Sequence, residues 1–248
     1  MLYIDNPNID VFFNLAAEEY LLKDFDQNIF MVWQSSPSVV IGRHQNVRAE
    51  VDINYAETNG IDIARRYSGG GAVYHDPGNL NLTFIESAGH IGFDKYADMT
   101  ARALQHLGLK PELDERRSIY LSGLKISGSA QCVYKHRLMY HATLLFDADL
   151  HRLTNVLNGE ADDISSASRV QVRSVKSPVT NIKPYLHGVL SVADFRTKIV
   201  KHLLEDGGEY IRYSWSEEDL TVINRIRESR YATASWNGIR PRLLSSCI

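Results

Sequence analysis

The sequence predicts an α+β protein in which helices pack on mixed or antiparallel β-sheets. Runs of β-branched and aromatic residues alternate with segments of helical periodicity, and short turns join most of the strand-like runs. The chain has 248 residues, of which 44% are hydrophobic, and no repeat, low-complexity tract or Pro/Ser-rich linker divides it. We therefore expect one domain spanning residues 1–248, with ample core.

The first part of the chain predicts one helix and two strands. Apolar residues recur at helical spacing over Asn14–Leu22, where Asn14 is a candidate N-cap. Short β-branched and aromatic runs at Ile29–Trp33 and Ser38–Ile41 are typical of strands, and the Ser-Ser-Pro between them is typical of a turn.

The rest of the chain continues this alternation. Strands are expected at Ala72–Tyr74, Leu80–Ile85, Ile119–Leu121, Leu124–Gly128 and Met139–Phe146. Helices are expected at Tyr96–Leu107, Asp149–Leu157, Val192–Leu204 and Glu217–Glu228. The Asp-Pro-Gly at residues 76–78 provides a turn between the first two of these strands.

Composition and charge exclude several classes of protein. With 27 basic and 30 acidic residues the net charge is -3, which gives no general attraction to nucleic acid or to an anionic membrane surface. No apolar run approaches the roughly 20 residues of a transmembrane helix, and the N-terminus lacks a secretory signal. Two cysteines, Cys132 and Cys247, do not suggest a disulfide framework or structural zinc. A cytoplasmic protein is expected.

Residues 65–76, Arg-Arg-Tyr-Ser-Gly-Gly-Gly-Ala-Val-Tyr-His-Asp, form the most informative segment. Three consecutive glycines cost backbone entropy, so a compensating role is expected. Their N–H groups could meet phosphate or carboxylate oxygens of a ligand, and Arg66 could add a forked cation. The alternative is a flexible hairpin or bulge. The segment lacks the Lys-Ser/Thr ending of a P-loop and the spaced glycines of a dinucleotide fold.

A second segment, residues 123–131, places Lys125 in an apolar strand pattern beside small residues. Its ammonium group could pair with an anion in a tight cavity, where a low dielectric strengthens the attraction. The alternative is a surface lysine on a hairpin. Asn79 and His141 either orient a substrate or satisfy hydrogen bonds in the core. Cys132 is a candidate thiol nucleophile, although free cysteines are usually buried and inert.

Together these segments resemble the lipoate-protein ligases. The resemblance rests on Arg-Arg-x-Ser-Gly-Gly-Gly-Ala-Val at residues 65–73 paired with Lys-Ile-Ser-Gly-Ser-Ala at residues 125–130. It is supported by Asn-Leu-Ala at 14–16 with Glu-Glu at 18–19, by Gly-Arg-His-Gln-Asn at 42–46 and by His141 before Thr-Leu-Leu, and it covers nearly the whole chain. It implies the α+β fold shared with the catalytic domain of biotin-protein ligases, which is class II synthetase-like. It also implies a two-step reaction in which lipoate and ATP form lipoyl-adenylate, which a lysine of a carrier domain then attacks.

The resemblance also implies the site residues. Lys125 matches the family's essential lysine, which acts in both half-reactions. Further residues would surround the adenylate and the lipoyl chain: Arg66, Ser68, Gly69, Gly70, Gly71, Ala72, His75, Asn79, Ser127, Gly128, Ala130, His141 and Thr143. ATP and Mg²⁺ are the implied cofactors, and the acceptor is the glycine-cleavage H protein or a lipoyl domain of a 2-oxoacid dehydrogenase. Lys135, Arg137 and Lys176 are candidates for a basic face that meets this acidic carrier.

The sequence departs from the family pattern at three places. The family's Asn-Asp-Ile is here Arg117-Ser118-Ile119, which removes an acidic side chain near the nucleotide or metal. The family's His-Gly-Thr carries Ala142 in place of the glycine. The smaller C-terminal domain of many family members is expected to be absent, because the sequence ends at Ile248. A separate accessory subunit, a degenerate paralogue, or a main activity of transfer from preformed adenylate would each fit this ending.

Two rival functions fit the same residues. One is an octanoyl or lipoyl transferase of the same fold, which uses a cysteine thioester and no ATP. The retained Gly71, Gly78 and Asn79 favour the ligase. The other rival is a lipoate-binding paralogue without full adenylation activity. A biotin ligase is less favoured, because its Gly-Arg-Gly-Arg nucleotide loop has no counterpart.

Overall fold

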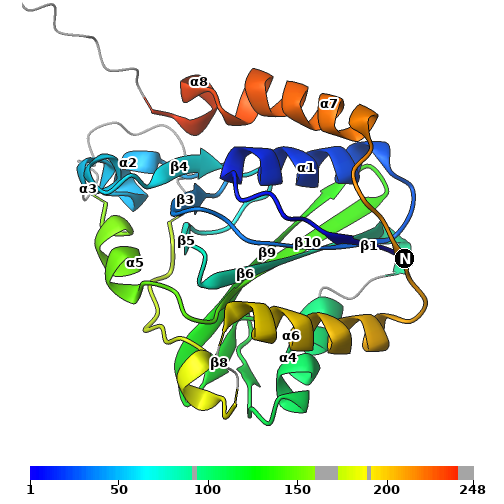
Figure 1. Ribbon diagram of the computed structural model, residues 1–248. Coiled ribbons are helices and arrows are strands. Elements are labelled where there is room, and N and C mark those ends of the chain that lie inside the picture. The colour runs from blue at the N-terminus through cyan, green and yellow to red at the C-terminus, as the bar shows by residue number, and fades with distance from the viewer. Residues whose placement is uncertain (91–93, 160–172, 189–190, 240–248) are drawn as a thin grey trace, which may run out of the picture.

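A computed structural model describes residues 1–90, 94–159, 173–188 and 191–239 (Figure 1), and within these its strands form a larger and a smaller sheet. The larger sheet has the order β11 (Ile211–Arg212), β1 (Leu2–Asp5), β2 (Ile29–Trp33), β6 (Asn79–Ser87), β10 (Arg137–Leu145), β9 (Leu124–Tyr134), β8 (Ile119–Leu121) and β7 (Glu112–Leu113). β1 pairs in parallel with β11 and β2, and the other neighbours are antiparallel. In the smaller sheet, β3 (Ser38–Ile41) is parallel to β4 (Asp62–Arg65) and antiparallel to β5 (Val73–His75).

Helices cover both faces of the larger sheet. The helices of the described residues are α1 (Val11–Asp24), α2 (Val47–Glu50), α3 (Ile53–Thr58), α4 (Lys95–His106), α5 (Leu150–Val156), α6 (Val192–Gly207), α7 (Glu217–Ile226) and α8 (Ala234–Asn237), of which α3, α5 and α8 contact the smaller sheet. Figure 1 shows α4 and α6 on one side of the sheet and α1, with α7 packed on it, on the other. The predicted α+β fold is confirmed. None of the helices in the described part of the chain is long and apolar enough to cross a membrane.

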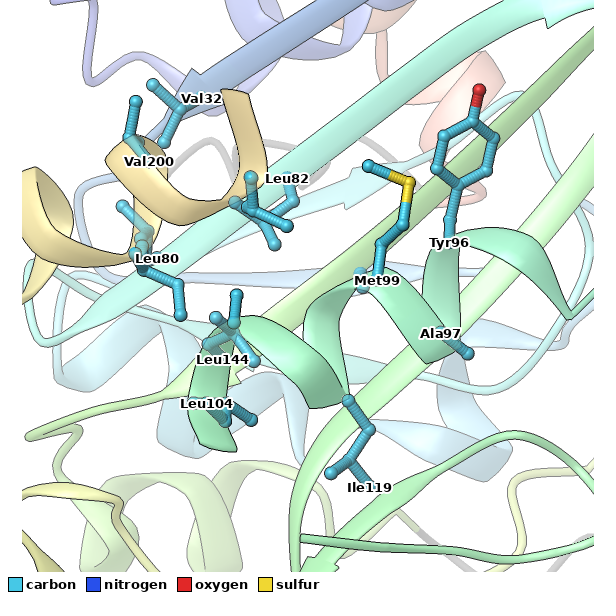
Figure 2. Packing of buried hydrophobic residues seen from close by; sticks show 14 of the residues in the cluster. Val32, Leu80, Leu82, Tyr96, Ala97, Met99, Leu104, Ile119, Leu144 and Val200 are labelled. Carbon is cyan, nitrogen blue, oxygen red and sulfur yellow. The ribbon is translucent and has the colours of Figure 1, made fainter. Parts of the chain in front are cut away.

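The main core lies between the larger sheet and the α4–α6 pair (Figure 2). Leu80, Leu82 and Leu144 of the sheet are fully buried there. They belong to one apolar cluster with Met99 of α4 and Val200 of α6. Burying a side chain of this size stabilises the fold by about 1.5–3 kcal/mol, so this core fixes the positions of β6 and β10.

Strand alternation then carries polar residues of β6 and β10 to the opposite face, toward α1. Asn81 and Thr83 alternate with the core leucines of β6, and His141 and Thr143 do the same on β10. The antiparallel register pairs His141 with Thr83 and Thr143 with Asn81. Four polar side chains therefore come together on one patch of the sheet.

The first helix begins earlier than its sequence pattern predicts. Asp10 is the N-cap of α1, because its carboxylate accepts hydrogen bonds from the N–H groups of Phe12 and Phe13. The prediction of Asn14 as N-cap was wrong. Asn14 is buried inside α1, and its amide donates to the carbonyl oxygens of Asn8 and Gln34.

The strand that contains Lys125 is longer than predicted. β9 continues to Tyr134, although Gly-Ser-Ala-Gln interrupts its apolar pattern. Its pairing with β10, from Arg137↔Tyr134 to Leu144↔Ser127, supplies the stabilisation that the local sequence lacks. β1, β4, α2 and α3 were not predicted, because each is short and has little periodicity of its own.

Candidate active site

A cavity of about 330 Å³ lies on the polar patch of the larger sheet. Its walls come from α1, β2, β3, β5, β6, β9 and β10 and from the glycine-rich loop after β4. A second cavity, of about 830 Å³, adjoins it. The two share the lining residues Ala72, Val73, Lys125, Gly128, Thr143, Ser174 and Val175.

Most residues implied by the resemblance converge on these cavities. The smaller cavity is lined by Arg66, Gly70, Gly71, Ala72, His75, Lys125, Gly128, Ala130, His141 and Thr143. Ser127 lines the larger one. Ser68 and Gly69 contact Arg66 without lining either cavity. Asn79 also lines neither, and its amide donates to the carbonyl oxygen of Tyr74 at 2.8 Å, so it holds the turn before β6.

Arg66 organises the glycine-rich loop. Its guanidinium donates to the carbonyl oxygens of Gly69, Gly71 and Val40 at 2.6, 2.7 and 3.1 Å. Gly70 has φ of 90°, and a Cβ there would lie 2.8 Å from the Arg66 guanidinium. The glycines therefore let the backbone pass around a buried arginine. The loop is held by the hydrogen bonds of Arg66, and it is not the flexible hairpin that the sequence left open as an alternative. Burial lowers the pKa of Arg66 to about 10, so the side chain remains a cation at neutral pH.

Arg65, the preceding residue, has a structural role. It donates to the carbonyl oxygens of Gly42 and Gln45 and, through Nε, to that of Trp236 at 2.9 Å. The Trp236 indole donates back to the carbonyl oxygen of Arg65 at 2.7 Å. Arg65 thus ties α8 to the loop after β3, and it lines neither cavity.

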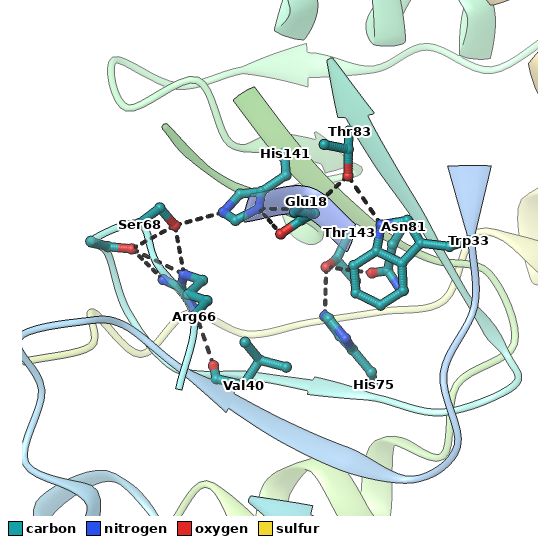
Figure 3. Close-up of polar contacts among 11 residues, drawn as sticks. Glu18, Trp33, Val40, Arg66, Ser68, His75, Asn81, Thr83, His141 and Thr143 are labelled. Atoms are coloured by element: carbon teal, nitrogen blue, oxygen red, sulfur yellow. Dashed lines mark hydrogen bonds and ion pairs between the residues drawn. The ribbon is translucent and has the colours of Figure 1, made fainter. Parts of the chain in front are cut away.

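Glu18 and His141 form the first of two hydrogen-bond networks at the cavity (Figure 3). His141 Nδ1 lies 3.1 Å from both carboxylate oxygens of Glu18, and Nε2 lies 2.7 Å from Ser68 Oγ. Thr83 donates to Glu18 at 2.6 Å and accepts from the Trp33 indole at 3.0 Å. Because Nδ1–H donates to the Glu18 carboxylate, which can only accept, Nε2 is the acceptor for the Ser68 hydroxyl.

Sequence reasoning did not predict Glu18 as a site residue. With α1 beginning at Val11, Glu18 falls on the same helix face as Val11, Leu15 and Leu22, and it is only 2% exposed. A carboxylate that shares a helix face with apolar residues was the available signal.

The second network joins His75, Thr143 and Asn81 (Figure 3). Thr143 Oγ1 donates to Asn81 Oδ1 at 3.0 Å and lies 3.0 Å from His75 Nε2, so the His75 ring donates from Nε2. Burial, helped by the charges of Arg66 and His141, lowers the pKa of His75 to about 3. His75 is therefore neutral at physiological pH. His75 Nδ1 and Asn81 Nδ2 have no hydrogen-bond partner in the described part of the chain.

Lys125 lines both cavities. Its side chain is half-buried and passes over Gly128, where a Cβ would lie 3.8 Å from Nζ. Within the described ranges, Nζ makes no ion pair or hydrogen bond. Burial, more than any nearby charge, lowers the pKa of Lys125. An anion placed at the junction of the cavities would meet a cation that no described residue pairs with.

Residues 173–180 form a strap along the shared wall of the cavities. The Lys125 N–H donates to the Pro178 carbonyl at 2.9 Å, and the Thr180 N–H donates to the Lys125 carbonyl at 3.0 Å. At the other end, Ser174 Oγ accepts from the Ala72 N–H at 2.8 Å and from the Gln45 amide at 3.1 Å. The strap therefore connects the glycine-rich loop to the lysine strand.

A family model described as the lipoyl protein ligase A/B catalytic domain matches residues 10–204. The chain belongs to this family. The resemblance to lipoate-protein ligases and the ligase class of enzyme are thereby confirmed. Lipoate-protein ligase LplJ of Bacillus subtilis is 38% identical over 245 residues, and lipoate–protein ligase 1 of Staphylococcus aureus is 36% identical over 243. Each match covers 96% of this chain and 73% of the relative.

Two solved structures are similar over nearly the whole length of this ligase. The putative lipoate protein ligase Ta0514 of T. acidophilum with bound lipoic acid has a TM-score of 0.79 and 25% identity, covering 95% of this chain and 98% of that chain. A bi-partite lipoate protein ligase, reported with its E2 lipoyl domain from Thermoplasma acidophilum, has a TM-score of 0.80 and 25% identity, covering 98% of both chains.

Cys132 and Arg137, which the sequence suggested for other roles in this ligase, line neither cavity. Cys132 is half-buried, and burial raises the pKa of its thiol to about 12, which disfavours the thiolate that a thioester-forming transferase needs. Cys247 lies outside the described residues. Arg137 is 3% exposed and donates to the carbonyl oxygens of Asp26 and Gln27. The prediction that Arg137 belongs to a basic surface was therefore wrong, because these inward hydrogen bonds bury it.

Proposed function

We propose that this lipoate-protein ligase activates lipoate with ATP and transfers the lipoyl group to a lysine of a carrier domain. In the first step the lipoate carboxylate attacks the α-phosphorus, the bond to the β-phosphate oxygen breaks, and pyrophosphate leaves. In the second step the carrier amine attacks the lipoyl carbonyl carbon and loses a proton, and AMP leaves. The observation that carries the proposal is the Lys125 cation, which lines both adjoining cavities and has no ion pair among the described residues.

The smaller cavity suits the acyl chain. Leu15, Trp33 and Val40 supply apolar wall, and His75 and Thr143 are hydrogen-bonded to each other there. Burying a methylene group in such surroundings gains about 0.8 kcal/mol, so an octanoyl-length chain and its dithiolane ring can be held without a charged contact. The carboxylate end would then lie toward Lys125.

The larger cavity suits the nucleoside. Its lining includes Leu145, Leu150 and Leu153, on which a base can pack, and the side-chain amides of Asn155 and Asn158, which can hydrogen-bond. In the described structure the N–H groups of Gly70 and Gly71 donate no hydrogen bond. Both can therefore donate to phosphate or carboxylate oxygens of a ligand. This division places the α-phosphate at the shared wall, beside Lys125.

At that position Lys125 would serve both steps. Negative charge builds on the α-phosphate as the carboxylate attacks, and it builds again on the adenylate phosphate as AMP leaves. A half-buried ammonium group stabilises both charges more strongly than a solvated one would. The buried Arg66 cation adds to the positive potential, while its hydrogen bonds keep the loop in place. Ser68, Gly69, Ala72, Ser127, Ala130 and His141 would complete the binding surface.

We infer that Mg²⁺ enters as a complex with ATP. In the residues that the structure describes, no group of three or more Asp, Glu, His or Cys side chains is placed to hold a metal ion. Mg²⁺ commonly binds through substrate phosphates and one or two carboxylates, and keeps several waters. The phosphates of ATP would therefore be its main ligands here, and the ion would neutralise part of their charge.

The carrier would be a lipoyl domain of a 2-oxoacid dehydrogenase or the glycine-cleavage H protein, met in the cytoplasm. The similar archaeal ligase, which is reported with its E2 lipoyl domain, supports a carrier of this kind. Lys135, at the β9–β10 turn, and Lys176, on the strap, are both exposed and remain candidates for the contact.

The intact mass of an apo carrier domain, incubated with the protein, lipoate, ATP and Mg²⁺, tests the proposal. We expect a gain of one lipoyl group that requires ATP, and Lys125→Ala should lower both adenylate formation and transfer by orders of magnitude. Lys183→Ala is a matched control, because Lys183 is paired with Asp147 and lines neither cavity.

Other outcomes would select the rival functions. Modification by an octanoyl-thioester donor without ATP would identify a transferase. Tight binding of lipoate or its adenylate without turnover would identify a binding protein. A Lys125→Ala variant with near wild-type transfer would contradict the role given to Lys125.

A further inference from the structure

The smaller cavity carries more positive charge than the residues discussed so far explain. Besides Arg66 and Lys125, its lining includes Arg116 and Arg173, and in the described part of the chain no Asp or Glu lines it. Arg116 is not among the residues that the family resemblance assigns to the site. It lies in the segment where this chain has Arg117-Ser118 in place of the family's Asn-Asp.

The turn that carries Arg116 is tightly held. Asp114 Oδ1 accepts from the N–H groups of Arg116 and Ser118 at 3.0 and 2.8 Å, and Asp114 Oδ2 accepts from the Tyr120 hydroxyl at 3.1 Å. The backbone of Asp114 also pairs with Ser118 and Arg117. These hydrogen bonds hold the backbone of the turn in one conformation, and they therefore fix the position from which the Arg116 side chain extends.

Adjacent arginines of this turn have different environments. Arg117 has φ of 60°, and its guanidinium pairs with Asp94 and Asp98, at the start of α4. Arg116 is exposed at the cavity, and it has no acidic partner among residues 1–90, 94–159, 173–188 and 191–239. Burial has the largest effect on the pKa of Lys125, and the charge of Asp114 opposes it. The charge of Arg116 also lowers the pKa of Lys125, so the two cations interact.

We propose that Arg116 binds a substrate oxyanion that is present only in the first half-reaction. This inference rests on the proposed function. Adenylation removes two anionic groups from the site: the polyphosphate tail leaves as pyrophosphate, and the lipoate carboxylate loses its charge when it becomes an acyl phosphate. An exposed guanidinium that shares a cavity wall with Lys125 and has no acidic partner among the described residues can bind either group through charge-assisted hydrogen bonds, whereas the lipoyl-adenylate retains neither.

The test compares Arg116→Gln with Arg117→Gln in the two half-reactions separately. Pyrophosphate release from lipoate and ATP measures adenylation, and transfer from preformed lipoyl-adenylate to an apo carrier measures the second step. We expect Arg116→Gln to lower kcat/KM of adenylation by about 10- to 100-fold, while transfer stays within about twofold of wild type. Arg116→Lys should recover part of the loss. Arg117→Gln should leave both steps near wild type, because its exposed ion pairs contribute little to stability.

The kinetic constants distinguish the two oxyanions. A raised KM for ATP with weaker inhibition by added pyrophosphate identifies the polyphosphate tail, and a raised KM for lipoate alone identifies the carboxylate. Wild-type adenylation in Arg116→Gln, or equal losses in both half-reactions, would overturn the inference. If the wild-type protein itself forms no adenylate, the proposed function fails, and that outcome is distinct from a failure of the Arg116 assignment.

Discussion

Ser68 Oγ lies 2.7 Å from Nε2 of His141, and the carboxylate of Glu18 holds Nδ1 of the same ring at 3.1 Å. Ser68 also accepts from Arg66 Nε at 3.1 Å. A relay of Ser68 and His141 therefore links the buried Arg66 cation to the buried Glu18 carboxylate (Figure 3). The relay fixes the tautomer of His141 and joins the glycine-rich loop to α1.

Removing the carboxylate tests this relay. Glu18→Ala leaves the His141 Nδ1–H and the Thr83 hydroxyl without their acceptor, so the free energy of unfolding should fall by about 2–4 kcal/mol. Glu18→Gln retains one acceptor oxygen and should cost less. Urea denaturation of the three proteins measures the differences. An alanine variant as stable as wild type would show that the network contributes nothing to the fold.

Gly42 is the second test, because the glycine-rich loop rests on it. A Cβ at Gly42 would lie 2.0 Å from the carbonyl oxygen of Gly70, whereas a Cβ at Gly69 meets nothing within 4 Å. Gly42→Ala should therefore destabilise the protein by about 2–4 kcal/mol, through displacement of the loop backbone. Gly69→Ala should change stability by less than about 0.5 kcal/mol. Thermal unfolding of the pair checks the difference, and equal effects would contradict the close packing.

His75 should make the fold sensitive to acid. Its pKa is about 3 in the folded protein and is expected near 6.5 in the unfolded chain. Between these values the unfolded chain binds a proton that the folded protein does not, so stability falls as the pH falls below 6.5 and the loss is complete below 3. At pH 5 this amounts to about 2 kcal/mol.

The matching measurement is urea unfolding at pH 7.5 and pH 5 for wild type and His75→Gln. The variant should lose that part of the pH dependence, whatever its stability at pH 7.5. An unchanged dependence would mean that other groups cause the acid sensitivity.

Lys125 should limit the reaction at alkaline pH. Its cationic form is the one proposed to stabilise the phosphate, and its pKa is lowered chiefly by burial. Adenylation should therefore decline as the pH rises through a value below the ordinary pKa of a lysine. The pH profile of kcat/KM reports this group in the free enzyme. A profile that stays flat to the pH of unfolding would argue against a cationic role.

Much of the fold follows from local sequence. The predicted helix at Tyr96–Leu107 corresponds to α4 and the predicted helix at Val192–Leu204 to α6, because both have apolar faces at helical spacing. The apolar run Ile29–Trp33 is β2 with the same bounds. The polar half of β9 was not predicted, since only its partner strand stabilises it.

Most residues of the site were predictable from local motifs, but their individual roles were not. Arg65 and Arg66 are adjacent and identical in type, yet one ties α8 to the loop after β3 and the other supports the glycine-rich loop. The local sequence around Glu18 does not indicate that its partner is His141, which is 123 residues away. Contacts of this kind depend on how the strands and α1 are placed, and local patterns carry no information about that placement.

By itself the sequence determined the family, the α+β class and the identity of the chemical groups, because motifs and apolar periodicity are local properties of the chain. Only the tertiary structure decided which cations remain without an acidic partner. Arg66 is occupied by backbone carbonyls and Arg117 by the aspartates near α4, whereas Lys125 and Arg116 face a cavity without a carboxylate among the described residues. The energy of a charge depends on its neighbours and its burial, and both are set by the packing of distant segments.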